Sequence, residues 1–307
     1  MGPNPFSRTA DEEVPKINLA ACGGMEIIML DLLIYNFSLP FVWPAMTVLA
    51  LVSFCAALLG SSLVLKRFSM IGDGLSHVAF GASAIAAATS WAPMAVAIPV
   101  TVLAAVLLLR LSNNAKIKGD AAIAMISSGA LAFGYMIMNL FPSSSSNVSG
   151  DACTTLFGSA SILGLTRSDV ITCIVLAAAV ILFFVFFYQK IFAITFDESF
   201  ASATGTRAEI YNTLLAVTTA VVIVIGMKMV GALLISALII FPALSSMRLF
   251  KTFFSVIISS VCIALFCAVF GGISSMLAGT PVGPTVVVFN IAVFAVFGTV
   301  GLIKGRA

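Results

Sequence analysis

The C-terminal part of the chain constrains the fold most strongly, because no Asp, Glu, Lys or Arg lies between Lys251 and Lys304. An α-helix needs only about 20 apolar residues to cross a bilayer, so this stretch is too long for one crossing. The sequence Gly-Thr-Pro-Val-Gly-Pro at residues 279–284 divides it, since Gly and Pro interrupt helices. We therefore predict two membrane-spanning helices joined by a tight turn.

Similar apolar runs fill most of the remaining chain. Hydrophobic residues make up 61% of the sequence and charged residues 9%, whereas a soluble domain has about half and about a quarter. Such a composition predicts an all-α polytopic membrane protein with eight or nine transmembrane helices. The run at 229–247 either crosses the membrane or is re-entrant, because only Lys228 separates it from the preceding run. The other runs cover residues 41–65, 68–88, 91–109, 121–141, 170–188 and 210–227.

The first residues differ in composition from the rest. Residues 1–36 are more polar and include the acidic group Asp11, Glu12 and Glu13. We expect an N-terminal polar tail that is disordered or lies outside the cytoplasm, followed by a transmembrane domain at 37–307. The net charge of +3 is small and indicates no nucleic-acid partner.

The distribution of basic residues predicts the orientation. Lys and Arg concentrate in the cytoplasmic loops of membrane proteins. If nine runs alternate from an outside start, only Arg8, Lys16, Arg167 and Lys228 fall outside. The others fall inside: Lys66, Arg67, Arg110, Lys116, Lys118, Lys190, Arg207, Arg248, Lys251, Lys304 and Arg306. The N-terminus is therefore predicted outside and the C-terminus in the cytoplasm, with residues 143–169 outside and 189–209 inside.

Asp73 and His77 are the main candidates for a functional site. His77 is the single histidine, and it follows by four residues an acid that interrupts an apolar run. Residues four apart share one face of a helix. Ionisable groups within a span cost about 2.5–3.5 kcal/mol on insertion scales and usually face a pathway or a partner. Three interpretations stay open: a site for a divalent metal, a structural pair between helices, or a proton relay.

Two side chains do not complete a metal site, because zinc usually takes four ligands. A second copy of the chain is the economical source of the others, and Ser76, backbone carbonyls and water are further candidates. Glycines at 72, 74 and 81 allow another helix to approach closely. An intramembrane serine protease is disfavoured, since Ser76 and His77 are adjacent and point to different sides of a helix.

The sequence contains no Gly-x-x-x-x-Gly-Lys-Ser/Thr phosphate-binding loop, so any ATPase would be a separate chain. The segment at 189–209 is a candidate docking surface for it. Aromatic and acidic side chains alternate there: Phe192, Phe196, Phe200, Asp197 and Glu198. A short amphipathic helix that contacts only lipid headgroups is the alternative interpretation.

The stretch at 61–77, SSLVLKRFSMIGDGLSH, closely resembles the hallmark of the zinc/manganese/iron permease family of ATP-binding-cassette importers. The hallmark is an apolar helix, a basic pair and Gly-Asp-x-x-Ser-His. Further segments resemble the family in order along the chain: Gly119-Asp120-Ala121-Ala122-Ile123, Leu156-Phe157-Gly158-Ser159, Phe196-Asp197 to Ala201 with Gly205, Val230-Gly231-Ala232-Leu233-Leu234 through Pro242, and Pro281-Val282-Gly283-Pro284-Thr285.

The resemblance implies a homodimeric permease in the cell membrane, working with two cytoplasmic ATPase subunits and an extracellular metal-delivering solute-binding protein. Asp73 and His77 would contact the ion in transit, with Ser76 as an additional pathway residue. The ATPase-coupling loop would include Ala201 and Gly205. The chain would not be an enzyme and would hold no permanent cofactor; the metal would be its cargo, and ATP would bind the partner subunit.

Rival functions make different predictions. A proton-coupled secondary metal transporter would use Asp73 and need no ATPase. A membrane scaffold or receptor would transport nothing. A permease for a metal chelate would have a wider, less charged pathway without the Asp73–His77 pair.

Overall fold

The computed structural model describes residues 39, 42–113, 119–141 and 165–303. This part of the chain forms ten helices and no strand. They are α2 (Val42–Leu65), α3 (Ile71–Ala88), α4 (Pro93–Asn113), α5 (Gly119–Leu140), α7 (Arg167–Phe196), α8 (Glu198–Ala203), α9 (Ala208–Val230), α10 (Ala232–Leu249), α11 (Phe253–Ala278) and α12 (Val282–Ile303). The predicted N-terminal tail at 1–36 lies outside the described residues.

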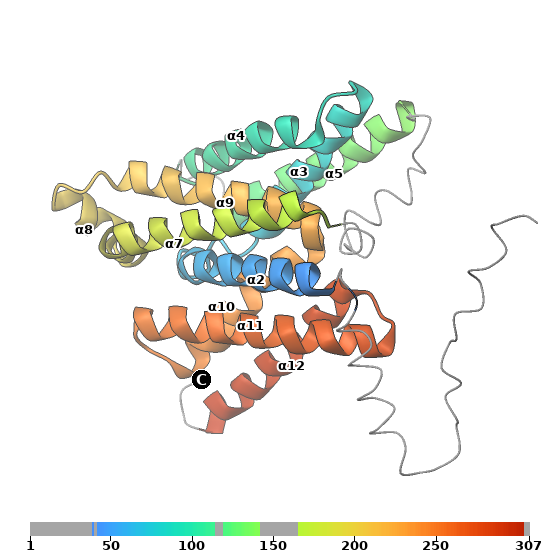
Figure 1. The fold of residues 1–307 in the computed structure, drawn as a ribbon. Coiled ribbons are helices and arrows are strands. Elements are labelled where there is room, and N and C mark those ends of the chain that lie inside the picture. The colour runs from blue at the N-terminus through green and yellow to red at the C-terminus, as the bar shows by residue number, and fades with distance from the viewer. Residues whose placement is uncertain (1–38, 40–41, 114–118, 142–164, 304–307) are drawn as a thin grey trace, which may run out of the picture.

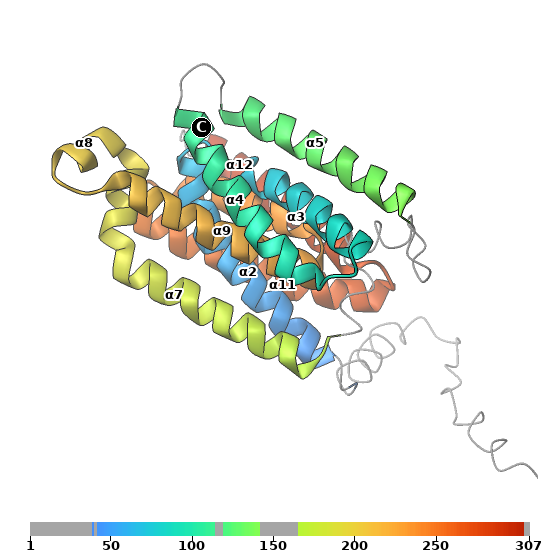
Figure 2. The same ribbon diagram turned by 90° about the horizontal axis from the view of Figure 1, so that it is seen from above.

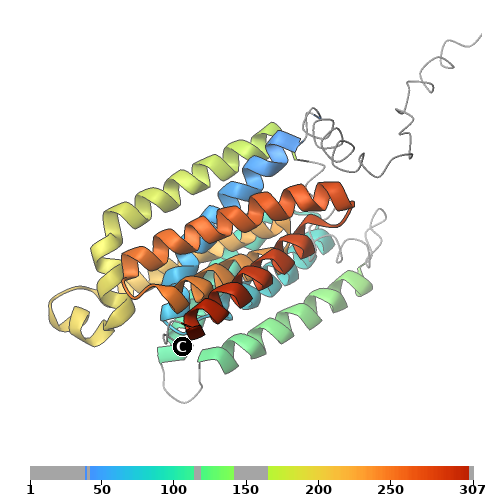
Figure 3. The same cartoon turned by 90° about the horizontal axis from the view of Figure 1, so that it is seen from below.

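The helices form a bundle with three groups, as Figure 1 shows. Helices α3, α4 and α5 lie on one side, α2, α7 and α9 in the middle, and α10, α11 and α12 on the other side. The middle helix α2 packs against α7, α9, α10 and α11. Helix α5 stands at the edge and packs mainly against α3 (Figure 2 and Figure 3).

Eight of the described helices are long and apolar enough to cross a membrane, which confirms the predicted all-α polytopic fold. They are α2, α4, α5, α7, α9, α10, α11 and α12. The ninth long helix, α3, is outside this set. It carries Asp73 and His77 and is rich in Gly, Ala and Ser. Much of α2, α9 and α10 is buried within the protein, whereas most of α4, α5, α7 and α12 is not. The central helices are thus shielded by neighbours, and the outer ones offer apolar faces to lipid.

Glycines mark the breaks between the C-terminal helices. The sequence placed the division between the sixth and seventh runs at Lys228, but α9 continues to Val230 and the break falls at Gly231, whose φ is 95°. Gly279, with a φ of 62°, ends α11 as predicted. Both angles lie in a region that glycine adopts without a Cβ clash. Helix α10 continues through Pro242, and its length and composition suffice for a crossing.

The segment at 189–209 differs from the predicted loop. Helix α7 extends without interruption through Phe196, and the six-residue helix α8 follows after Asp197. The apolar residues Ile191, Phe192, Ala193 and Ile194 continue the helical pattern past Lys190, so a charge near the membrane surface does not end the helix. The docking candidate is consequently a short helix on a long helical arm.

The helices alternate in direction. Helix α8 and the C-terminal end of α12 lie at one end of the bundle, while α2 and α7 begin at the other (Figure 1, Figure 3). The prediction of orientation from the basic residues assumes that successive helices cross in opposite directions, and the structure has this alternation. The assignment of the α8 end to the cytoplasm remains a prediction.

Candidate ion site and its surroundings

Asp73 and His77 form a pair on α3. The Nε2 atom of His77 lies 3.4 Å from Oδ1 of Asp73, which is the contact that their spacing of four predicts. The Asp73 side chain is 47% exposed and that of His77 is 18% exposed in the isolated chain. The carboxylate therefore lies on the surface of the isolated chain, and the imidazole beside it is more deeply buried.

Ser76 lies in a different environment. Its side chain is fully buried, and Oγ donates a hydrogen bond of 2.8 Å to the backbone carbonyl of Asp73. The hydroxyl is thus engaged with the backbone at the start of α3, away from the exposed carboxylate. The structure brings Asp73 and His77 together but does not add the Ser76 oxygen to their open side.

Three glycines hold α3 tightly between two other helices. A Cβ on Gly72 would lie 3.1 Å from Cδ1 of Ile239 in α10. On the other side, a Cβ on Gly74 would lie 2.6 Å from Cγ2 of Ile123 in α5, and one on Gly81 would lie 2.8 Å from a backbone oxygen in α5. Close helix approach at these glycines is therefore as predicted.

The described residues offer only part of a coordination shell. Among the described residues, no group of three or more His, Cys, Asp and Glu side chains could hold a metal ion. Carboxylate oxygen and imidazole nitrogen are both ligands for zinc, manganese and iron. The pair thus fits such an ion chemically, and the remaining ligands must come from elsewhere.

Lys66, at the turn between α2 and α3, reaches into the protein. Its Nζ donates a hydrogen bond to Oδ1 of Asn212 in α9. Burial lowers the pKa of the Lys66 ammonium to about 8, while the charge of Glu198 opposes that shift. Lys66, Glu198 and Asn212 line a cleft of about 310 Å³ together with parts of α7. No sequence pattern indicates this contact, because Lys66 resembles an ordinary surface charge at the end of a span.

Helix α8 begins at a capping residue and exposes an aromatic ring. Oδ1 of Asp197 accepts a hydrogen bond of 2.8 Å from the backbone N–H of Phe200. The Phe200 side chain is 65% exposed, whereas Ala201 is buried. Gly205, with a φ of 84°, forms the turn after α8. Phe200 is therefore an exposed aromatic residue within the predicted docking segment, and docking at this position stays a prediction.

The other predicted aromatic residues have a structural role as well. The Phe196 ring lies 5.0 Å from the Phe192 ring and 5.8 Å from the Phe253 ring of α11. Both Phe192 and Phe196 remain partly exposed, at 44% and 58%. They fasten the end of α7 to α11 in addition to offering surface.

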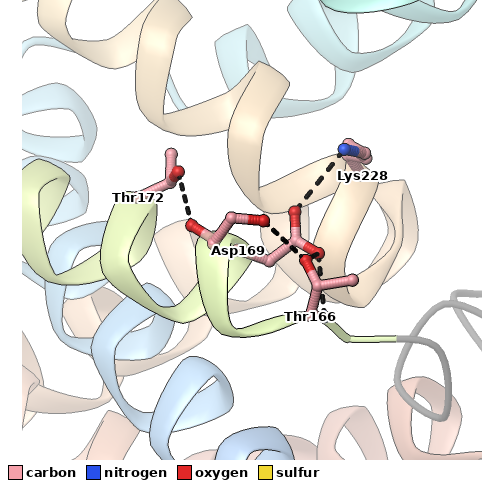
Figure 4. A network of polar contacts seen from close by, with 5 residues as sticks. Thr166, Asp169, Thr172 and Lys228 are labelled. Atoms are coloured by element: carbon pink, nitrogen blue, oxygen red, sulfur yellow. Dashed lines mark hydrogen bonds and ion pairs between the residues drawn. The ribbon is translucent and has the colours of Figure 1, made fainter.

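At the opposite end of the bundle an ion pair joins α7 to α9. Nζ of Lys228 lies 3.6 Å from Oδ1 of Asp169, and Oδ2 of that carboxylate accepts hydrogen bonds from Thr166 Oγ1 and N at 2.7 and 3.0 Å (Figure 4). The sequence suggested a lysine at the membrane surface but no partner for it. Asp169 and Lys228 are 59 positions apart, so no local sequence pattern indicates that they pair.

Comparison with known families accounts for most of the chain. Residues 38–300 match the model of the ABC 3 transport family. The chain belongs to the ABC 3 transport family. Asp73, His77 and α8 all lie within the matched residues, as does 156–159, a resemblance segment outside the described residues.

The similarity to individual relatives extends over most of this chain and most of each relative. The chain is 31% identical to the chelated iron transport system membrane protein YfeC of Yersinia pestis, covering 87% of this chain and 88% of that protein. It is 26% identical to the high-affinity zinc uptake system membrane protein ZnuB of Haemophilus influenzae, covering 82% and 94%. The solved structure of PsaBC from Streptococcus pneumoniae in complex with Fab superposes with a TM-score of 0.75 at 26% identity, covering 89% of this chain and 95% of that one.

Proposed function

We propose that this chain is the membrane permease subunit of an ATP-driven importer of divalent transition-metal ions such as zinc, manganese or iron. The observation that carries the proposal is the Asp73–His77 pair, formed at 3.4 Å on one face of α3 and open to the outside of the chain. Membership of the ABC 3 transport family and the similarity to proteins named for zinc and iron transport support it.

The exposed pair is suited to an ion that passes between two copies of the chain. An uncompensated carboxylate is costly near lipid, so a 47% exposed Asp73 calls for cover in the assembled protein. A two-fold axis beside α3 would supply Asp73 and His77 twice, giving two oxygen and two nitrogen donors. Such a homodimeric shell would supply the four ligands that zinc usually takes.

ATP hydrolysis takes place on separate subunits in this proposal. The sequence has no phosphate-binding loop, and α8 presents Phe200 at the end of the bundle away from the starts of α2 and α7. Two cytoplasmic ATPases would dock there, and a solute-binding protein would deliver the metal at the opposite, extracellular end. The permease would perform no covalent chemistry, and it would sit with its N-terminus outside.

Uptake of individual metals tests the function. Cells lacking the chain should take up less of one metal under limitation for it, and the wild-type chain should restore uptake. A substitution in the ATP site of the partner ATPase should abolish the restored uptake. Uptake that survives that substitution but collapses with the proton gradient would support a proton-coupled secondary transporter instead. Unchanged metal contents in the deletion strain would contradict transport altogether.

A further inference from the structure

Helix α8 is packed against the start of α9 by its one buried residue. That residue is Ala201, which lies in an apolar cluster with Ile194 of α7 and Ala208 of α9. Ala208 is the first residue of α9. Packed protein interiors are nearly incompressible, so a displacement of α8 at this contact is passed to the first turn of α9.

The next turn of α9 holds the turn between α2 and α3. Asn212 follows Ala208 by four residues, so the two side chains share one face of α9. The Asn212 side chain is buried, and its Oδ1 accepts the hydrogen bond from Nζ of Lys66. Lys66 is the first residue after α2, in the turn that leads to α3. This hydrogen bond therefore joins the start of α9 to that turn.

Backbone hydrogen bonds tie the turn to both of its helices. The N–H of Phe68 donates to the carbonyl of Leu63 in α2 at 2.9 Å, and the carbonyl of Phe68 accepts from the N–H of Ile71, the first residue of α3, at 3.2 Å. Between them Arg67 has a φ of 64°, in the left-handed conformation that commonly ends a helix. Movement of the turn consequently moves the first turn of α3, which carries Asp73.

We infer that Lys66 is a positioning residue for α3: through its hydrogen bond to Asn212, movement of α8 reaches the helix that carries the proposed ion site. An ATPase that acts on α8 would shift the first turn of α9, and Asn212 would draw Lys66 and the start of α3 with it. Glu198 of α8 lines the same cleft as Lys66 and Asn212, so movement of α8 also changes the negative charge near the ammonium. The inference rests on the proposed function, since it takes α8 as the place where the ATPase acts.

A double substitution removes the hydrogen bond without leaving a buried polar group unpaired. Replacement of both partners by apolar side chains of similar shape is nearly neutral for stability. Lys66→Met combined with Asn212→Leu should therefore insert normally, unfold at a midpoint no lower than that of the wild type, and recover the ATPase on co-purification. In vesicles that contain the ATPase and the solute-binding protein, metal imported per ATP hydrolysed should fall about 2–30-fold, the range typical of substitutions along a chain of coupled contacts.

Two single variants serve as comparisons. Asn212→Asp keeps an oxygen acceptor for Lys66 and should keep the wild-type ratio of metal imported to ATP hydrolysed. Thr213→Val is the matched control on α9, because the Thr213 hydroxyl donates within the helix to the carbonyl of Glu209 and not to Lys66. It too should keep the wild-type ratio.

Spin labels follow the movement itself. One label is placed at Thr204→Cys, in the turn after α8, and another at Met70→Cys, at the 49% exposed residue before α3, each in a cysteine-free permease purified with its ATPase. In the otherwise wild-type protein, ATP with vanadate should change the spectra of both labels. In the Lys66→Met and Asn212→Leu double variant, only the label at Thr204→Cys should respond.

Three results would overturn the inference. The first is a wild-type import ratio in the double variant, and the second is a label at Met70→Cys that responds to ATP equally with and without the hydrogen bond. The third is a loss of ATPase recovery in the double variant in proportion to the loss of uptake, because Lys66 would then serve docking. If wild-type vesicles import no metal while the labels behave as expected, the proposed cargo is wrong and the inference stands.

Discussion

A Cβ placed on Gly81 of α3 would lie 2.8 Å from the backbone oxygen of Ala130 in α5. The two helices are therefore in backbone contact, one turn beyond His77. Helix α5 packs chiefly on α3, so this contact holds α5 against the helix that carries Asp73 and His77.

Gly81→Ala should accordingly destabilise the protein. The added methyl group cannot fit without moving α5, and overpacking of this kind typically costs about 1–3 kcal/mol. The measurement is the midpoint of thermal unfolding of the purified permease in detergent. Gly129→Ala is the matched control on α5, because a Cβ there meets nothing within 4 Å. Equal midpoints for the two variants would contradict the close contact.

The buried Lys66 should make stability depend on pH. Its pKa is about 8 in the folded protein, below the ordinary value of 10.5, so the unfolded chain binds more protons between these values. Wild-type stability should therefore rise between pH 8 and 10.5 relative to Lys66→Met, by up to about 1.4 kcal/mol per pH unit. Below pH 8 the cost of burying the charge is fully present.

Unfolding midpoints across that pH range check the Lys66 prediction. Lys190→Met is the control, because Lys190 is an exposed lysine near the same end of α7. Its pH profile should parallel that of the wild type. If Lys66→Met also parallels the wild type, Lys66 is not held in a desolvated position.

Phe200 should matter for the ATPase and not for folding. Its ring is 65% exposed and forms no ring contact among those of the described residues, so Phe200→Ala leaves the helices intact. We expect the variant to reach the membrane at normal levels but to retain less ATPase on co-purification and to lose ATP-driven uptake. Phe186→Ala is the control, because Phe186 on α7 is 77% exposed, and this variant should behave like the wild type. Normal ATPase recovery with Phe200→Ala would exclude α8 as the docking site.

The sequence predicted those parts of the fold that depend on local sequence patterns. Apolar runs without charge correspond to the spanning helices, and the Gly279 break falls where it was expected. The i, i+4 spacing also predicted the Asp73–His77 contact. These features are local, since they follow from helix geometry and from the cost of charge in lipid.

Contacts across the chain could not be predicted in the same way. The Lys66–Asn212 and Asp169–Lys228 contacts each join segments that are distant in sequence, and the residue types alone do not identify the partners. The extension of α7 past Lys190 differs from the sequence-based prediction, in which the charge near the membrane surface marks the end of the helix.

Orientation can be tested with single cysteines in a cysteine-free background. Thr280→Cys, in the exposed turn before α12, should react with a membrane-impermeant reagent applied to intact cells. Thr204→Cys, in the turn after α8, should react only after permeabilisation. The expectation follows from the eleven basic residues on the α8 side in the predicted topology. The reverse labelling pattern would place α8 outside and rule out an ATPase there.

Transport by Asp73→Asn tests the central proposal most directly. The substitution keeps the size of the side chain but removes the anionic ligand beside Nε2 of His77. The permease should be reconstituted in vesicles with its ATPase and solute-binding protein, and ATP-driven uptake of radioactive zinc, manganese and iron measured in turn. We predict that Asp73→Asn and His77→Ala, inserted at wild-type levels, reduce uptake of the transported metal to the background of protein-free vesicles. Wild-type uptake rates in both variants would show that the pair is structural and that the ion takes another path.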